Sequence, residues 1–249
     1  MRRMALEDAG LPRPRRVRAG EARGGGRQVE KSAQTRIAIL EATLDCLVEV
    51  GYAQTTADKI VRRAGVSRGA MTHHFKARAE VFEAAALFVI ERRADEYDRM
   101  IGRMRVHPAG MPSLDDMRAT MTVLQQYFAL PSLLALSELQ RGARTDLGFR
   151  RAMYPLEKAL DKKISDSMVK HFPFLSEVEQ TRQVLMDLIL SSLRPIAIGM
   201  APALTGARLR RLLDQLAVVA LREITEAKSN LKPEAKTPGK DIQSKGDAT

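Results

Sequence analysis

Apolar residues recur along most of this chain at steps of three and four, which is the spacing of one face of an α-helix. Between residues 37 and 47 these positions are Ile37, Leu40, Leu44 and Leu47, and Gly51 follows where a helix would end. No stretch shows the sustained alternation of apolar and polar residues that is typical of a half-buried β-strand. The pattern therefore predicts an all-α fold of about nine helices.

Residues typical of helix N-termini divide this helical pattern into separate helices. Ser113 precedes an apolar run and has Asp116 three residues after it, which is the pattern of a capping box. Pro131 can occupy the first turn of the following helix. Ser176 and Glu179 repeat the capping-box spacing, and we expect a helix to begin there.

The two ends of the chain lack the helical pattern. Residues 1–31 include "LPRPRRVRAGEARGGGRQ", which is rich in Arg, Gly and Pro. Residues 228–249 contain no aromatic residue and few apolar ones. We expect disorder at both ends, as a basic arm over 1–31 and a tail over 228–249.

Composition and charge narrow the classes of function. The apolar fraction of 45% is that of a globular protein, and no apolar run approaches the length of about 18 residues that a membrane span needs. One cysteine, Cys46, and the lack of a secretory signal favour a cytoplasmic protein. The formal charge is +11, and residues 1–31 hold nine Lys or Arg against four Asp or Glu. This excess favours a polyanionic partner, and a solubilising end is the alternative.

The segment "TTADKIVRRAGVSRGAMTHHF" predicts two short helices joined by a tight turn. Thr56 can cap the first helix, Gly65 ends it, and Ser67 can cap the second. Met71 and Phe75 are one turn apart and predict a buried face on the second helix. Its other positions are small, cationic or hydrogen-bonding. This is the pattern of a helix-turn-helix, whose second helix enters the major groove of DNA.

A longer stretch, "TRIAILEATLDCLVEVGYAQTTADKIVRRAGVSRGAMTHHFKARAEVF", resembles the N-terminal domain of the TetR family of bacterial repressors. The resemblance covers residues 32–92 and places the helix-turn-helix at 56–75. It implies a three-helix DNA-binding head, joined by a long helix to a ligand-binding and dimerisation domain over 93–227. It also implies a homodimeric, sequence-specific transcriptional regulator that binds a palindromic operator in double-stranded DNA. We further expect a small-molecule effector to relieve repression.

The same resemblance assigns roles to residues near the second helix. Arg68, Gly69 and Ala70 match the positions that read bases, and a guanidinium suits the O6 and N7 acceptors of guanine. Family members usually have tyrosine where this chain has Thr72, so that contact is expected to be shorter, lost or made through water. The full set of expected DNA-binding residues is Thr56, Ser67, Arg68, Gly69, Ala70, Thr72, His73, His74, Lys76 and Arg78.

Other chemistry finds little support in the sequence. His73 and His74 are adjacent, so their side chains point about 100° apart on a helix, and no further ligand has metal-site spacing. No catalytic motif appears, and we expect no cofactor, no metal and no catalytic residue. The alternatives are an all-α enzyme or ligand-binding protein that does not bind DNA, and a regulator that lost DNA binding through Thr72.

The remaining pattern suggests how the two domains communicate. One long helix is predicted from Ala79 to about Val106, with its stop at His107-Pro108, and it would touch both domains. The dimer interface is expected within 177–227. The effector is expected to be apolar or amphipathic. No motif marks its site, and six polar residues near the apolar stripes could orient it: Gln125, Gln126, Tyr127, Glu138, Arg141 and Tyr154. The dimer contacts are expected at Val184, Leu188, Leu209, Leu212, Leu216 and Val219.

Overall fold

A computed structural model describes residues 21–104 and 111–231 of the chain. Within these residues the fold is all-α, as the sequence predicts, with nine α-helices, one short 3-10 helix and no strand. None of the described helices is long and apolar enough to cross a membrane. The elements are α1 Glu21–Gln54, α2 Ala57–Ala64, α3 Arg68–His74, α4 Arg78–Ile101, α5 Leu114–Phe128, α6 Pro131–Ala143, α7 Leu147–His171, η1 Pro173–Glu177, α8 Glu179–Ala197 and α9 Gly206–Leu231.

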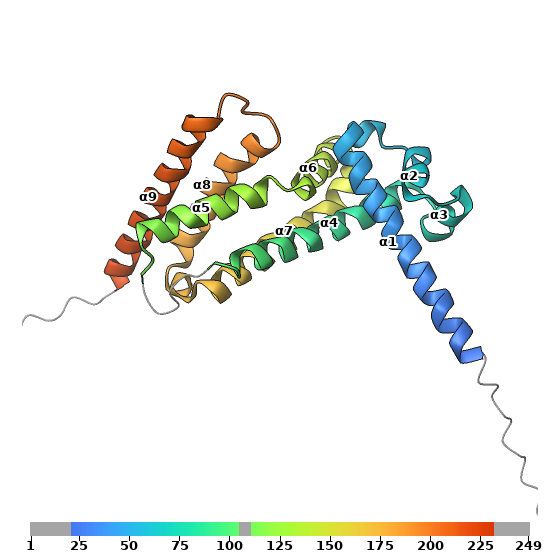
Figure 1. Cartoon of the computed structure of the whole chain (residues 1–249), viewed down its shortest axis with the longest axis horizontal. Coiled ribbons are helices and arrows are strands. Elements are labelled where there is room, and N and C mark those ends of the chain that lie inside the picture. The colour runs from blue at the N-terminus through green and yellow to red at the C-terminus, as the bar shows by residue number, and fades with distance from the viewer. Residues whose placement is uncertain (1–20, 105–110, 232–249) are drawn as a thin grey trace, which may run out of the picture.

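Figure 1 shows a head at one end of the molecule, made by α1, α2 and α3, and a larger helical body. Helices α4, α6 and α7 run from the head into the body, and α5, α8 and α9 form the far end. Helix α4 packs against α1, α6 and α7, and α1 also packs directly on α6. The N-terminal half of α1 projects away from the rest of the protein (Figure 1).

Helix α4 connects the head to the body, as predicted. Val81 and Phe82 at its beginning are buried, and so are Tyr97 and Ile101 at its end. The predicted end near Val106 is wrong, because the helix ends at Ile101 and the N–H of Gly102 donates to the carbonyl of Asp98 at 2.9 Å. The predicted stop at His107-Pro108 lies outside the described residues.

The predicted disorder of both ends is partly wrong. Helix α1 begins at Glu21, so residues 21–31 are helical, and α9 continues to Leu231, so residues 228–231 are helical too. Once a helix has formed, each added residue gains one hydrogen bond and no further nucleation is needed. A helix can therefore extend beyond the segment that has the apolar pattern. Residues 1–20 and 232–249 lie outside the described part of the chain.

One of the two predicted capping boxes is confirmed. The Ser113 hydroxyl accepts from the Asp116 N–H at 3.1 Å, and the Asp116 carboxylate accepts from the Ser113 N–H at 2.8 Å. The box predicted for Ser176 and Glu179 is wrong. The Ser176 hydroxyl instead donates to the carbonyl of Pro173 at 2.7 Å within η1. It is therefore engaged in a local hydrogen bond, and α8 starts without a side-chain cap.

Candidate nucleic-acid interface and body cavity

The turn between α2 and α3 forms as its residue types predict. Thr56 caps α2 by accepting from the N–H of Lys59 at 3.4 Å. Gly65 ends α2 in the left-handed region at φ 66°, where a side chain would be strained. Ser67 then caps α3 by accepting from the N–H of Ala70 at 3.1 Å. These caps fix the start of α3 relative to α2.

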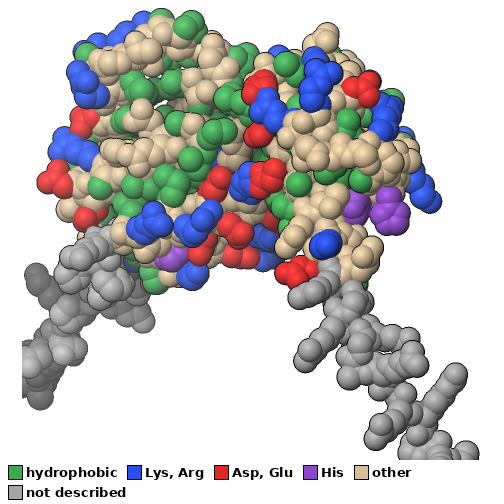
Figure 2. Space-filling view, turned by 45° about the vertical axis from the view of Figure 1, so that its right-hand side comes forward, with side chains coloured by type: hydrophobic (Ala, Val, Ile, Leu, Met, Phe, Trp, Pro, Cys, Tyr) green, Lys and Arg blue, Asp and Glu red, His purple; other side chains and the backbone are tan. Residues whose placement is uncertain are grey.

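One face of α3 is buried and the opposite face is open. Met71 and Phe75 are buried, as predicted, and the guanidinium of Arg36 from α1 lies 5.0 Å from the centre of the Phe75 ring. Figure 2 shows imidazole side chains at the surface of the right-hand lobe. The exposed residues around α3 are Ser67, Arg68, Gly69, Thr72, His73 and Lys76, and Ala70 and His74 are half-buried.

Arg68 and Thr72 both have partners in the free protein. Arg68 forms an ion pair with Asp58 from the first turn of α2, and both side chains are exposed. Such a surface pair contributes only about 0–1 kcal/mol, so another acceptor can replace Asp58 at little cost. The Thr72 hydroxyl donates to the carbonyl of Arg68 at 2.9 Å. That hydroxyl therefore lies against its own helix, and it does not extend outward as a tyrosine hydroxyl would.

The two histidines differ in their surroundings. His73 is exposed, whereas His74 is half-buried, and the ring centres are 5.3 Å apart. Partial burial lowers the pKa of His74, and the neighbouring His73 and Arg36 lower it further. A neutral His74 presents one N–H at neutral pH, which is enough to donate to a single acceptor.

Arg78 has a structural set of contacts that the sequence did not reveal. Its Nε donates to the carbonyl of Thr55 at 3.2 Å and its Nη2 to the carbonyl of Tyr52 at 2.8 Å. Its guanidinium also lies 4.4 Å from the centre of the Phe82 ring. Arg78 thus ties the loop between α1 and α2 to the beginning of α4. Lys76, close by, is exposed, and its backbone N–H donates to Glu80 at 2.9 Å.

Tyr52 joins the head to the body. Its backbone N–H donates to the Glu138 carboxylate of α6 at 3.0 Å. Its ring lies against Gly142 of the same helix, where a Cβ would come within 2.3 Å of two ring carbons. The ring centre is 4.8 Å from Phe82 of α4 and 6.0 Å from Phe149 of α7. Helices α4, α6 and α7 therefore hold the last turn of α1, just before the loop to α2.

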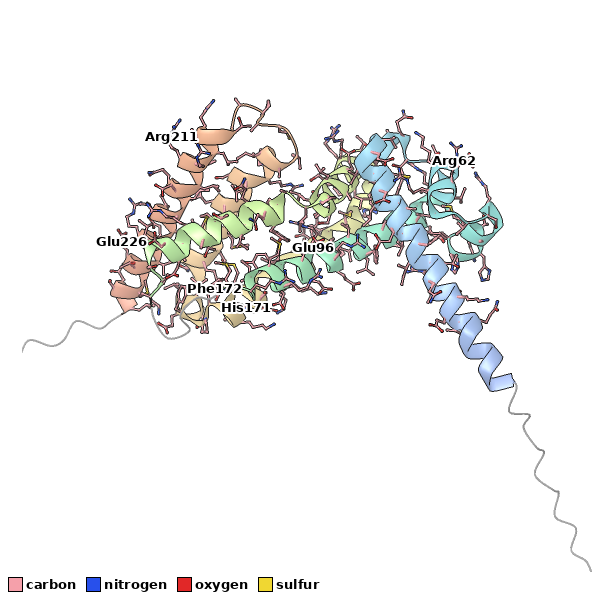
Figure 3. All side chains as sticks on the ribbon, viewed as in Figure 1. Arg62, Glu96, His171, Phe172, Arg211 and Glu226 are labelled. Atoms are coloured by element: carbon pink, nitrogen blue, oxygen red, sulfur yellow. The ribbon has the colours of Figure 1, made fainter. Side chains whose placement is uncertain are left out.

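A cavity of about 800 Å³, partly open to solvent, lies in the body and is lined by residues of α4, α5, α6, α7 and α8. Of the six polar residues proposed from the sequence, Tyr127 lines this cavity and the other five do not. Three arginines line it instead: Arg93, Arg182 and Arg194. Figure 3 labels Glu96, one turn after Arg93 on α4, near the middle of the molecule and well away from Arg62 in the head. The missed signal was an arginine on an apolar stripe, since Arg93 stands four residues from Val89 and from Tyr97.

Comparison with known proteins identifies the family. The sequence profile described as "Bacterial regulatory proteins, tetR family" matches residues 39–85. An uncharacterized HTH-type transcriptional regulator of Mycobacterium tuberculosis is 31% identical over 140 residues, which cover 56% of this chain and 69% of that protein. The chain belongs to the TetR family. The HTH-type transcriptional regulator BetI of Klebsiella pneumoniae is 35% identical over 75 residues, or 30% of this chain and 37% of that protein.

Solved structures of transcriptional regulators share the fold of this chain over most of its length. A transcriptional regulator from Streptomyces coelicolor A3(2) aligns with a TM-score of 0.56 at 24% identity, over 76% of this chain and 98% of that one. A TetR-family regulator from Streptomyces coelicolor aligns with a TM-score of 0.58 at 17% identity, over 80% and 83% of the two chains. The protein is a DNA-binding transcription regulator. Its family consists of transcriptional regulators and is not an enzyme family.

Proposed function

We propose that this protein is a ligand-relieved repressor that binds a palindromic operator as a homodimer. The head over residues 32–92 would bind DNA, and the body over 93–227 would bind the effector and form the dimer. The observation that carries the proposal is the 800 Å³ cavity in the body, lined by Arg93 and Tyr97 of the same α4 helix that begins in the head. A volume of this size suits a small organic ligand.

The open face of α3 would enter the major groove. Arg68 would leave Asp58 to donate to a guanine, while Gly69 and Ala70 allow the helix to approach the bases closely. Phosphate contacts would come from Thr56, Ser67, Thr72, His73, His74 and Lys76. Arg78 would act mainly by holding the loop before α2 in place, because its donors already bind backbone carbonyls.

The dimer interface would lie on the outer face of α8 and α9. Val184 and Leu188, one turn apart on α8, are 66% and 41% exposed in the single chain, and Val218 of α9 is exposed as well. Apolar side chains in such a row are typical of an interface. Leu216 does not belong to this face, contrary to the sequence-based expectation, because it is 6% exposed and packs in the core of its own chain. Of the other expected contacts, Leu209, Leu212 and Val219 are half-buried.

The cavity and the head would be coupled through α4. A ligand that fits one tilt of α4 better than another shifts the balance between them. A tilt would move Arg78 and Phe82, which hold Tyr52 at the end of α1, and so change the distance between the two α3 helices of a dimer. The coupling is reciprocal and typically amounts to about 1–3 kcal/mol.

The test is to titrate compounds from a thermal-shift screen into the complex with operator DNA. The operator would be taken from the promoter region beside the protein's own gene, and its affinity would be followed by fluorescence anisotropy. We expect a compound that raises the melting temperature to weaken operator binding by about 5–150-fold at saturation. Ligands that bind in the cavity and leave operator affinity unchanged would contradict the proposal.

A further inference from the structure

The large cavity of the body and a smaller one of about 50 Å³ share part of their walls. Both are lined by Arg182 and Met186 of α8 and by Tyr97 of α4. The smaller cavity is otherwise almost entirely apolar, and the larger one carries the charged residues. Arg182 therefore stands where the polar space meets the apolar space.

The guanidinium of Arg182 is buried and lacks a full set of partners. The residue is 7% exposed, and its Nε has no hydrogen-bond acceptor within reach. Its Nη1 donates to the hydroxyl of Ser165 on α7. The nearest carboxylate within ion-pair range, that of Glu179, is 3.9 Å from Nη2 and exposed, which is too far for a hydrogen bond. A buried charge with so little compensation is costly unless something else pairs with it.

The other two arginines of the cavity differ from Arg182 in their partners or in their burial. The Nε of Arg93 is likewise buried with no acceptor within reach, but the rest of its guanidinium makes several contacts. Arg93 Nη1 donates to the carbonyl of Tyr127 at 2.9 Å and lies 3.6 Å from the carboxylate of Glu96. Its guanidinium also lies 3.6 Å from the centre of the Tyr127 ring. Arg194 donates to Gln140, whose own amide donates to Glu157 at 2.6 Å. Arg194 is half-buried, so solvent can also reach it. Of the two buried arginines, Arg182 therefore has fewer hydrogen bonds than Arg93.

The apolar side of Arg182 is lined by flexible side chains. Met117, Met121, Met168 and Met186 line the smaller cavity, together with Phe172 and Phe174. Figure 3 places Phe172 at the end of α7, on the side of the body away from the head. Methionine side chains repack easily around irregular ligands, so this space can widen to accept a hydrocarbon chain or a ring.

We propose that the effector is an amphipathic carboxylate, whose carboxylate binds Arg182 and whose hydrocarbon part enters the methionine-lined space. This inference rests on the proposed function, in which the cavity holds the effector. The Nε and Nη2 of Arg182 form the side of a guanidinium that binds a carboxylate with two parallel hydrogen bonds. The acidic residues of the large cavity, Glu157, Asp161 and Asp187, lie near one another, since burial raises the pKa of Asp161 and the charges of Glu157 and Asp187 raise it further, and they oppose an anion beside them. None of the three forms an ion pair with Arg182, whose one carboxylate in range among the described residues is that of Glu179.

The experiment measures binding affinity for probes that differ in charge, and for variants that differ in which arginine is replaced. Decanoate and 4-butylbenzoate would be titrated by calorimetry against the full-length protein, with decanol and decylamine as uncharged and cationic counterparts. The variants are Arg182→Gln, and Arg194→Gln as a control arginine on the same helix and cavity. Arg182→Lys serves as a second variant, which keeps the charge but loses the two-pronged donor.

We expect at least one carboxylate to bind the wild type more tightly than decanol or decylamine. Arg182→Gln and Arg182→Lys should weaken that binding by about tenfold or more, and Arg194→Gln by less than about threefold. The proposal is overturned if neither carboxylate binds, if the alcohol or amine binds as tightly, or if Arg182→Gln and Arg182→Lys leave the affinity unchanged.

Operator affinity, measured in the same samples, separates this proposal from the proposed function. Carboxylates that need Arg182 for binding but leave the operator complex intact would support the ligand class and contradict relief of repression. Decanol that releases the operator where the carboxylates do not would support relief of repression and contradict the ligand class.

Discussion

Replacing Gly142 with alanine should destabilise the protein through the junction between head and body. A Cβ at this position would lie 2.3 Å from two carbons of the Tyr52 ring, whereas non-bonded carbons rest at about 3.5–4.0 Å. The ring cannot turn aside freely, because Phe82 and Phe149 lie 4.8 Å and 6.0 Å from its centre. The guanidinium of Arg78 also lies 5.1 Å from the ring centre.

The expected loss is the balance of three contributions. Alanine in a helix is favoured over glycine by about 1 kcal/mol, whereas forcing extra volume into a packed site costs about 1–3 kcal/mol. A displaced Tyr52 would also lose its hydrogen bond to the Glu138 carboxylate, a loss of about 1.5–3 kcal/mol. We expect the free energy of unfolding to fall by about 1.5–5 kcal/mol when Tyr52 is displaced.

Urea unfolding followed by circular dichroism measures this change. The matched control is Gly148→Ala in the first turn of α7, where a Cβ would meet only the Asp146 carboxylate at 3.4 Å, an ordinary contact. The control should be as stable as the wild type or up to about 1 kcal/mol more stable. A Gly142→Ala variant as stable as the Gly148→Ala variant would show that the Tyr52 ring does not pack closely against Gly142 of α6.

Four further predictions test other parts of the account. Arg68→Ala should weaken operator binding by about 1–3 kcal/mol and relax preference at one base pair, and an equal loss on random DNA would leave only a phosphate role. Val184→Glu should give a folded monomer by light scattering, whereas Leu216→Glu should unfold the chain; a Val184→Glu variant that remains a dimer would place the interface elsewhere. Hydrogen bonds from Ser167, His171 and Lys170 lower the pKa of Asp98 to about 2, so the stability that it adds is present above about pH 4 and is lost as the pH falls toward 2. Asp98→Asn should therefore reduce the loss of stability between pH 4 and 2 in acid titrations, and an unchanged acid profile would refute this. Deleting the basic residues 2–20 should flatten the salt dependence of DNA binding, and an unchanged slope would mean that they do not contact phosphates.

The sequence predicted the head well because its signals are local. Caps at Thr56 and Ser67 and the turn at Gly65 each involve residues within a few positions of one another, and all three formed as expected. Met71 and Phe75 were predicted as core because a helical step of four places them on one face, and both are buried.

The parts that the sequence did not predict depend on distant contacts. Arg78 binds carbonyls more than twenty residues earlier in the chain, and Arg182 meets Ser165 across a helix boundary. Neither of these two contacts joins residues at a regular helical spacing, so hydrophobic periodicity could not predict them. Leu216 belongs to an apolar stripe whose two sides face the core and the solvent, and periodicity alone does not say which is which.

Selection of bound duplexes from a random DNA library tests the central claim most directly, namely that α3 reads an operator as one half of a symmetric pair. The account predicts that the wild-type protein enriches a two-fold symmetric sequence whose half-sites are separated by whole turns of the duplex, about 10 base pairs or a multiple of it. It also predicts that Arg68→Ala enriches the same site with one position relaxed in each half. A library that yields no enriched sequence, or one without symmetry, would contradict the account.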